Sequence, residues 1–242
     1  MEHIALISDI HGNMEAFEKV LSDIDSSGVG EIFNLGDNIG YGPEPDQVIK
    51  KVQSRKIPSV LGNHELAMKN AKYLEWFNPA ARESLLKSIE LLSDQSKDYI
   101  LKQPAYLIAN DCRFVHGFPP DSALLYLFQV SDSRKIRTFE QMKEGVCFVG
   151  HTHTLEMISY DGKNMEYEFL GEGIAHLRRE NRYIINIGSV GQPRDGDNRA
   201  KYAIWDASRF TIEIKCIPYY IASVVKKLRA AGFPEQHGAR LW

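Results

Sequence analysis

Residues 4–13, IALISDIHGN, run from an apolar segment straight into an aspartate and a histidine, Asp9 and His11. Asp, Asn or His beside glycine follows an apolar run four more times, at Gly36-Asp37-Asn38, Gly62-Asn63-His64-Glu65, His116-Gly117 and Gly150-His151-Thr152-His153. The apolar runs are typical of buried strands and cover residues 4–7, 32–35, 59–61, 113–115 and 146–149. Because ligands bind at the carboxyl edge of open α/β sheets, the five motifs predict one polar site there.

The donor atoms of these motifs favour a metal centre. Carboxylate oxygen, amide oxygen and imidazole nitrogen suit Mn, Fe, Ni or Zn and match a thiolate site poorly. In Asp9-Ile10-His11 and His151-Thr152-His153 the donors are two residues apart. In extended backbone both side chains of such a pair face the same way and can serve one site. A single motif of this kind is more typical of a turn or a helix cap, but five together favour a set of ligands.

Helical spacing between the first strands predicts an α/β fold. Asn13 is a candidate N-cap for a helix that ends at Gly28 and Gly30. The apolar residues at helical spacing on its inward face are Phe17, Val20, Leu21 and Ile24. A second helix is expected from about Pro45 to Gln53, before the run at 59–61. This βαβαβ order favours parallel pairing of the strands.

The rest of the chain predicts a helical insertion, hairpins and a terminal helix. Residues 66–104 are interpreted as a helical insertion in a single domain that spans residues 1–242. Its first helix begins near Pro79 and has an apolar face of Leu85, Leu86, Ile89 and Leu92, and a shorter helix follows around 98–101. Turn pairs separate β-rich runs at 110–111, 161–162 and 207–208. Residues 221–231 predict an amphipathic helix whose basic face is solvated.

In this order the five motifs resemble the signature of the calcineurin-like metallophosphoesterases, which runs D-x-H, G-D-x-x, G-N-H-D/E, H and G-H-x-H. Residues 186–196, NIGSVGQPRDG, resemble the loop that follows the last block in the bacterial small-phosphodiesterase and diadenosine-tetraphosphatase-like branch. The resemblance covers nearly the whole chain. It implies a four-layer αββα sandwich of two mixed β-sheets flanked by helices.

The resemblance also implies a dinuclear site for two divalent transition-metal ions, with Mn first and Fe, Ni or Zn as alternatives. One ion is expected on Asp9, His11 and His153, the other on Asn63, His116 and His151, with Asp37 bridging both. His64 stays free of metal and reaches toward the leaving-group oxygen. Glu65 stands where many members have Asp, a departure that bears on the substrate rather than the reaction.

The charges of such a site suit phosphate chemistry. Two divalent ions bring four positive charges, Asp9 and Asp37 return two, and a bridging hydroxide returns one, so the pocket stays positive. Ions about 3.5–4 Å apart lower the pKa of a shared water and stabilise an in-line displacement. No Ser or Cys nucleophile is required, and His64 is the expected general acid. The remaining histidines are interpreted as structural or surface residues: His3, His176 and His237.

The candidate substrate contacts are Arg194 and Tyr41. Arg194 lies in a glycine-rich loop and can bind phosphate oxygens with two parallel hydrogen bonds, although a plain surface arginine is an equal alternative. Tyr41 follows Asp37 where protein phosphatases of this superfamily carry a phosphate-binding arginine, which argues against a phosphoprotein substrate. Aromatic residues that can line a pocket for a base or aryl group, or else pack in the core, are Tyr41, Phe118, Tyr126 and Phe128.

The composition is consistent with a cytoplasmic enzyme. The chain has 242 residues, 43% of them hydrophobic, which is enough for a substantial core. Cys112, Cys147 and Cys216 show no C-x-x-C spacing, argue against a secreted disulfide scaffold and are expected to be small buried side chains. The early first strand leaves no room for a leader, and no apolar run is long enough to span a membrane. A net charge of −3 gives no global attraction for nucleic acid.

We predict a two-metal phosphoesterase of small phosphate esters or nucleotides, mainly a phosphodiesterase with some phosphomonoesterase activity. An alternative within the same class is a hydrolase of dinucleoside polyphosphates. An alternative of another class is a non-catalytic, protein-binding scaffold with the same fold. Such a scaffold is expected to lack the catalytic histidine, whereas His64 and the full donor set are present.

Overall fold

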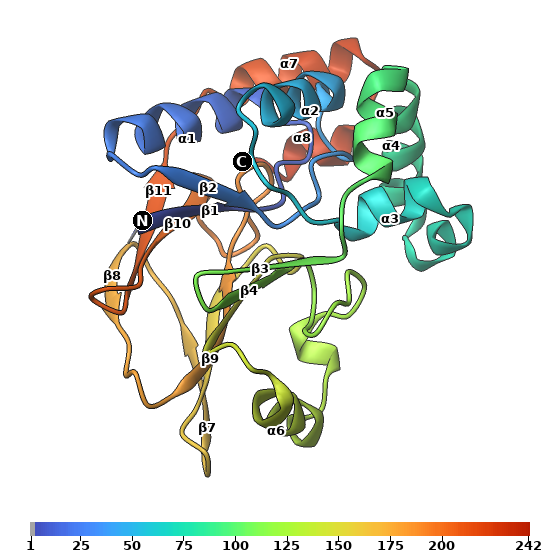
Figure 1. Cartoon of the computed structure of the whole chain (residues 1–242). Coiled ribbons are helices and arrows are strands. Elements are labelled where there is room, and N and C mark those ends of the chain that lie inside the picture. Colours follow the sequence, from blue (N-terminus) through green and yellow to red (C-terminus); the bar gives the residue numbers. More distant parts are fainter. Residues whose placement is uncertain (1–2) are drawn as a thin grey trace.

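In the computed structural model, which describes residues 3–242, two β-sheets pack face to face and helices cover their outer faces (Figure 1). The first sheet contains, in spatial order, β2 (Glu31–Asn34), β1 (His3–Ile7), β10 (Ala200–Asp206), β11 (Thr211–Ile217) and β8 (Gly173–His176). The second contains β3 (Tyr106–Ala109), β4 (Cys112–Val115), β5 (Val146–Val149), β9 (Arg182–Ile187), β6 (Leu155–Tyr160) and β7 (Met165–Phe169). Both sheets mix parallel and antiparallel pairs, so the predicted sandwich of two mixed sheets is confirmed.

The core between the sheets explains why residues 4–7 of the first strand are all apolar. In β1, Ile4 and Leu6 pack against the second sheet, whereas Ala5 and Ile7 pack against the helices on the other face. A strand covered on both faces has no polar side, so its sequence does not alternate. Between the sheets, the rings of Phe33 and Phe114 stack with centroids 4.4 Å apart. The three cysteines are buried and unpaired, as predicted: Cys112, Cys147 and Cys216.

Helices α1 (Met14–Ser26) and α2 (Pro45–Ser54) cover the first sheet, α7 (Ile221–Ala230) packs outside them against α1, and α6 (Asp132–Gln141) covers the second sheet (Figure 1). The Asn13 side chain accepts a hydrogen bond from the Ala16 N–H, which confirms the predicted cap of α1. Helices α6 and α8 (Glu235–Ala239) and the short η2 (Leu127–Gln129) lie outside every segment that was predicted to be helical. Within residues 3–242, no helix is both long and apolar enough to cross a membrane.

A helical segment connects β2 of the first sheet to β3 of the second and forms one side of the site. It comprises α3 (Asn63–Lys69), η1 (Ala71–Trp76), α4 (Pro79–Glu90) and α5 (Asp94–Leu101). The shorter helix predicted around residues 98–101 is α5. It begins earlier than expected, because the Ser93 side chain caps it by accepting a hydrogen bond from the Ser96 N–H. Leu86 was placed on the apolar face of α4, but 42% of it is exposed. Its neighbour Leu85 is buried, and adjacent helical residues point about 100° apart.

Two other expectations need correction. The predicted strand at 59–61 is a single parallel bridge between Asn34 and Ser59, because Leu61 turns away and its N–H donates to the carbonyl of Pro104. The basic face of the terminal helix is only partly solvated, since Lys227 forms ion pairs with two acids of the neighbouring elements. The three predicted hairpin turns are confirmed by the antiparallel pairs β3–β4, β6–β7 and β10–β11.

Candidate metal centre

The five motifs meet at one end of the sandwich, where their loops hydrogen-bond to one another. The Asp9 N–H donates to the carbonyl of Gly36 at 3.0 Å, which joins the loops after β1 and β2. The Gly150 N–H donates to the carbonyl of His116 at 2.8 Å, which joins the loops after β4 and β5. A further bond, from the Gly191 N–H to the carbonyl of Asp9, connects the two sheets. Residues more than 140 positions apart therefore share one site.

The backbone at this site is left-handed where the ligands were predicted. Five predicted ligands have positive φ: Asp9 (53°), His11 (47°), Asp37 (55°), His151 (69°) and His153 (63°). The expectation that extended backbone aligns each pair is therefore wrong. His151 and His153 belong to different donor groups of the same site, so the two side chains do not face the same way. Such backbone costs about 1–3 kcal/mol per residue and is typical of functional sites.

Two glycines allow the loops to approach this closely. A Cβ on Gly62 would overlap the carboxylate and backbone nitrogen of Asp37. A Cβ on Gly150 would overlap the hydroxyl of Ser8 and the carboxylate of Asp9. The glycines of the G-N-H and G-H-x-H motifs are thus required by contact between loops.

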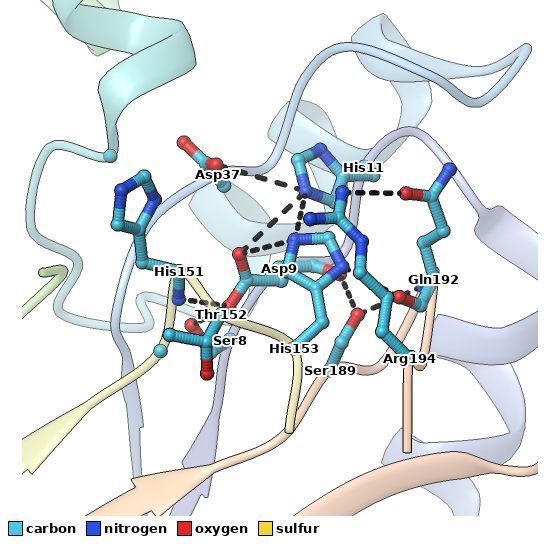
Figure 2. A network of polar contacts seen from close by, with 12 residues as sticks. Ser8, Asp9, His11, Asp37, His151, Thr152, His153, Ser189, Gln192 and Arg194 are labelled. Atoms are coloured by element: carbon cyan, nitrogen blue, oxygen red, sulfur yellow. Dashed lines mark hydrogen bonds and ion pairs between the residues drawn. The ribbon is translucent and has the colours of Figure 1, made fainter. Parts of the chain in front are cut away.

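The first donor group consists of Asp9, His11 and His153, which Figure 2 shows turned toward one another. The Nε2 atoms of His11 and His153 are 3.1 Å apart, and the Nε2 of His153 is 3.1 Å from Asp9 Oδ1. Asp9 Oδ2 accepts hydrogen bonds from the Ser8 hydroxyl and the His151 N–H. Asp9 Oδ1 is buried and accepts none. One carboxylate oxygen is thus held in place while the other is left for a cation.

The second donor group consists of Asp37, His116 and His151, with Asn63 beside them. The Nε2 of His116 lies 3.2 Å from Asp37 Oδ2, 3.2 Å from the Nδ1 of His151 and 3.1 Å from Asn63 Oδ1. Asp37 Oδ2 is also 3.7 Å from the Nε2 of His11, in the first group. Asp37 therefore lies between the two groups.

Four histidines of the donor groups each have one ring nitrogen that faces away from the site, here called outward, and one that faces into it, called inward. The contact of the outward nitrogen determines whether the inward nitrogen carries a proton. Each outward nitrogen contacts a backbone carbonyl: His11 at Ile39, His116 at Leu35, His151 at Leu124 and His153 at Gln192, at 2.6–3.2 Å. A carbonyl only accepts, so the outward nitrogen carries the proton, and in a neutral ring the inward nitrogen presents a lone pair. Two pairs of inward nitrogens meet at 3.1 and 3.2 Å. Lone pairs this close repel unless a proton or cation lies between them, so the donor set fits metal ions.

The pKa shifts agree with this fit. Burial raises the pKa of Asp9, but His153 and its neighbours outweigh burial and hold the pKa well below its usual range. Burial lowers the pKa of His151 to about 3 and that of His153 to about 4. Burial also lowers the pKa of His116, but the Asp37 carboxylate outweighs it and raises the pKa to about 9. Metal binding should therefore displace a proton from this site.

His64 lies at the start of α3, in contact with Asp37. Its N–H donates to Asp37 Oδ1 at 3.0 Å, and its Nε2 is 3.8 Å from Asp37 Oδ2. The ring lies between those of Tyr41 and Phe77, and its Nδ1 is buried without a hydrogen-bond partner. Burial lowers its pKa well below the usual value. The ring is also close enough to form a third donor group with His11 and Asp37.

Glu65 has a structural role that the sequence did not reveal. Its buried carboxylate accepts hydrogen bonds from the backbone N–H groups of Asp37, Asn38 and Gly62, at 2.7–3.0 Å. It therefore ties the loop that carries Asp37 to the start of α3. Three backbone donors favour the ionised form, while burial and the nearby Asp37 raise its pKa to about 7. The three-residue spacing from Gly62 is that of a capping box, which is the signal that could have identified this role.

Glu65→Gln is expected to destabilise the metal-free protein by about 1–3 kcal/mol, because an amide NH₂ cannot accept from the backbone donors and leaves at least one unpaired. Urea unfolding in the presence of a chelator measures this effect without a contribution from metal. Glu90→Gln on the exposed end of α4 is the matched control. A change below about 0.5 kcal/mol for Glu65→Gln, which is ordinary for surface positions, would contradict the role.

The donor groups open into a small cleft with a cavity volume of about 80 Å³. Its other walls are Tyr41, Trp76, Phe77, Asn78, Ala81, Leu124, Tyr126 and Arg194. Tyr126 stacks on His151 with centroids 3.7 Å apart. Phe118, predicted as a pocket residue, is buried in the core around α6, and Phe128 stacks on Tyr126 away from the cleft and is 74% exposed. Trp76 and Phe77 were missed, because they belong to no motif and reach the cleft only through the position of η1.

Both predicted substrate residues lie at the cleft. The Tyr41 ring meets that of His11 edge-on at 4.7 Å, and its N–H donates to the Ser84 hydroxyl of α4. The guanidinium of Arg194 lies 5.8 Å from the centre of the Tyr41 ring and donates to the Gln192 side chain at 2.9 Å (Figure 2). His237, predicted to be structural, is buried against Tyr41 at 5.2 Å.

Two mixed sheets between layers of helices, with clustered Asp, Asn and His donors at one loop end, define the metallophosphoesterase type of fold and site. A sequence model of the calcineurin-like phosphoesterase superfamily domain matches residues 1–209. The chain belongs to this superfamily, whose members are metal-dependent, and it is a phosphoric ester hydrolase.

Similar proteins support this placement. An uncharacterized protein of Methanocaldococcus jannaschii is 34% identical, with 99% of this chain and 97% of that protein covered. The crystal structure of a metallophosphoesterase from Sphaerobacter thermophilus is 35% identical with a TM-score of 0.82, and covers 99% of this chain and 97% of its own. A symmetrical bis(5'-nucleosyl)-tetraphosphatase of Delftia acidovorans is 30% identical over 46% of this chain and 40% of its own length.

Proposed function

We propose that the protein is a dinuclear metal-dependent phosphoesterase that hydrolyses small phosphodiesters or nucleotides. The observation that carries this proposal is the pair of donor groups whose inward nitrogens meet at 3.1 and 3.2 Å on either side of Asp37. With a single ion, the other pair of nitrogens depends on a proton, such as the one that His116 carries in the metal-free protein because its pKa is raised to about 9. Two ions satisfy both.

In this proposal the seven predicted ligands divide as the motifs suggest. Asp9, His11 and His153 hold one ion, Asn63, His116 and His151 hold the other, and Asp37 contacts both. Mn is the first candidate, and Fe, Ni or Zn suit the same nitrogen and oxygen donors. When bound, the two ions supply a Lewis acid for the phosphoryl oxygens and lower the pKa of a shared water.

The protein side chains supply the remaining steps. His64 is the proposed general acid: its ring borders the cleft next to Asp37 and can deliver a proton to the leaving oxygen. Arg194 is proposed to hold a phosphoryl oxygen that the metal ions leave free. Tyr41 packs against His11 and His64 and keeps water away from both rings.

The narrow cleft favours a small substrate over a phosphoprotein. Trp76, Phe77 and Tyr126 border a cavity of about 80 Å³ and offer aromatic surface for a base or aryl group. The second candidate, a dinucleoside polyphosphate hydrolase, draws support from the local similarity to a bis(5'-nucleosyl)-tetraphosphatase. A substrate panel with Mn tests the proposal: bis(4-nitrophenyl) phosphate or nucleotides should be hydrolysed far faster than phosphopeptides. A preference for phosphopeptides would contradict it.

Arg194→Ala is expected to lower kcat/KM by about 10- to 150-fold, because a charge-assisted contact contributes about 1.5–3 kcal/mol. Lysine should restore only part of the activity, since it lacks the planar fork of the guanidinium. Arg137→Ala, on the exposed face of α6, is the matched control. Steady-state kinetics with bis(4-nitrophenyl) phosphate give the result, and an Arg194→Ala enzyme with wild-type kinetics would exclude the contact.

A further inference from the structure

The C-terminal residues lie outside the matched superfamily domain and yet border the site. The superfamily match ends at residue 209, whereas α7 and α8 follow it. Lys227 of α7 forms ion pairs with Glu15 of α1 at 2.8 Å and with Glu44 before α2 at 2.7 Å. His237 of α8 packs on Tyr41 of the cleft. The terminal segment is therefore fixed against the loops that carry the ligands.

A second cavity, of about 500 Å³, lies between this segment and the loop after β9. It is lined by Pro193, Arg194, Gly196, Asp197, Asn198, Arg240 and Trp242. Arg194 lines both this cavity and the metal cleft, so the two spaces are neighbours. The Asn198 side chain donates to the backbone oxygen of Trp242 at 3.4 Å and connects this loop to the end of the terminal segment.

The acids of this loop are engaged elsewhere. Asp195 pairs with Lys201 at 2.8 Å, and Asp197 pairs with Arg199 at 2.6 Å. Over residues 3–242, the structure shows no carboxylate within salt-bridge distance of the Arg194 or Arg240 guanidinium. Asp197, which is paired with Arg199, and the terminal carboxylate of Trp242 also line this cavity, but neither lies within salt-bridge distance of the two guanidiniums. An anion that binds between Arg194 and Arg240 is attracted by both charges.

Arg240 lines the same cavity as Arg194, and Arg194 also lines the metal cleft. A ligand that extends from the cleft past Arg194 would next meet Arg240.

We propose that Arg240, together with Arg194, forms a second anion subsite next to the metal cleft, so that the preferred substrates carry two or more linked phosphates. This inference rests on the proposed phosphoesterase function and narrows its substrate class. The guanidinium forks suit the oxygens of a second phosphate, which is held while the first is hydrolysed. A simple diester has no group for this subsite.

The kinetic test compares diadenosine tetraphosphate and inorganic tripolyphosphate with bis(4-nitrophenyl) phosphate, using the full-length Mn-loaded protein. In Arg240→Ala, the ratio of kcat/KM for each phosphate chain to that for the diester should fall about 10- to 100-fold, the worth of a charge-assisted contact. Arg240→Lys should restore part of the ratio. Arg229→Ala, an exposed arginine at the end of α7, is the matched control and should leave the ratio unchanged.

A binding test is independent of turnover. Calorimetry should show that the wild type binds methylenediphosphonate about 10- to 100-fold more tightly than methylphosphonate, and that Arg240→Ala removes most of this difference. An unchanged preference in Arg240→Ala would overturn the subsite. A kinetic loss confined to diadenosine tetraphosphate would also overturn it, because the subsite would then recognise a nucleoside. If no ester is hydrolysed at all, the proposed function fails, while the diphosphonate preference still decides the subsite.

Discussion

Asp37→Ala is expected to lose metal at both positions and essentially all phosphoesterase activity. Asp37 Oδ2 lies 3.2 Å from the Nε2 of His116 and 3.7 Å from that of His11, so one oxygen faces both donor groups. Its other oxygen accepts from the His64 N–H and positions the start of α3. Removing the carboxylate therefore removes the shared ligand. It also removes the hydrogen bond that positions His64, the proposed general acid.

Elemental analysis of the purified variant measures this loss directly. Asp37→Asn keeps the size of the side chain and separates the loss of charge from the loss of packing. Asp98→Ala, on the exposed face of α5, is the matched control and should keep both metal and activity. Two ions per chain in Asp37→Ala would show that Asp37 does not bridge the ions.

His64→Ala is expected to keep the metal ions while kcat falls by about 10²- to 10⁴-fold, the usual contribution of a positioned general acid. The ring is buried at the edge of the cleft, and its Nε2 lies 3.8 Å from Asp37 Oδ2, on the side of the donor groups where a leaving group would bind. The seven proposed ligands do not include His64, which is why binding and catalysis should separate here. His176→Ala, at an exposed position of β8, is the matched control.

The nature of the leaving group sharpens this prediction. Nitrophenolate needs little protonation when it departs, so His64→Ala should lose less activity on nitrophenyl esters than on alkyl esters. Equal losses on both would favour electrostatic support over proton donation. Loss of metal from His64→Ala would instead point to the third donor group, in which His64 joins His11 and Asp37.

Much of the site could be predicted because its residue types are rare in combination. Asp, Asn and His at the ends of apolar runs are visible in the sequence, and the structure brings all seven predicted ligands together. Four of the five runs form strands, because a strand buried on both faces is largely apolar, whereas the run at 59–61 forms only a bridge. The helix that follows Asn13 could be predicted from its cap and its spacing.

The features of the site that could not be predicted depend on packing between residues far apart in the sequence, which local patterns do not encode. The positive φ of Asp9 and His153 follows from loops that press on each other, not from the residues alone. Trp76 borders the cleft and Arg240 borders the neighbouring cavity because of where η1 and α8 pack, and neither residue belongs to a motif. The single domain over residues 1–242 and the cytoplasmic location stay predictions.

The most direct test of the dinuclear proposal is a Mn titration of chelator-treated protein, with bound metal and hydrolysis of bis(4-nitrophenyl) phosphate measured on the same samples. The two donor groups around Asp37 predict saturation at two ions per chain, with activity that reaches its maximum only as the second ion binds. Saturation at one ion per chain, or full activity in the chelated protein, would contradict this account.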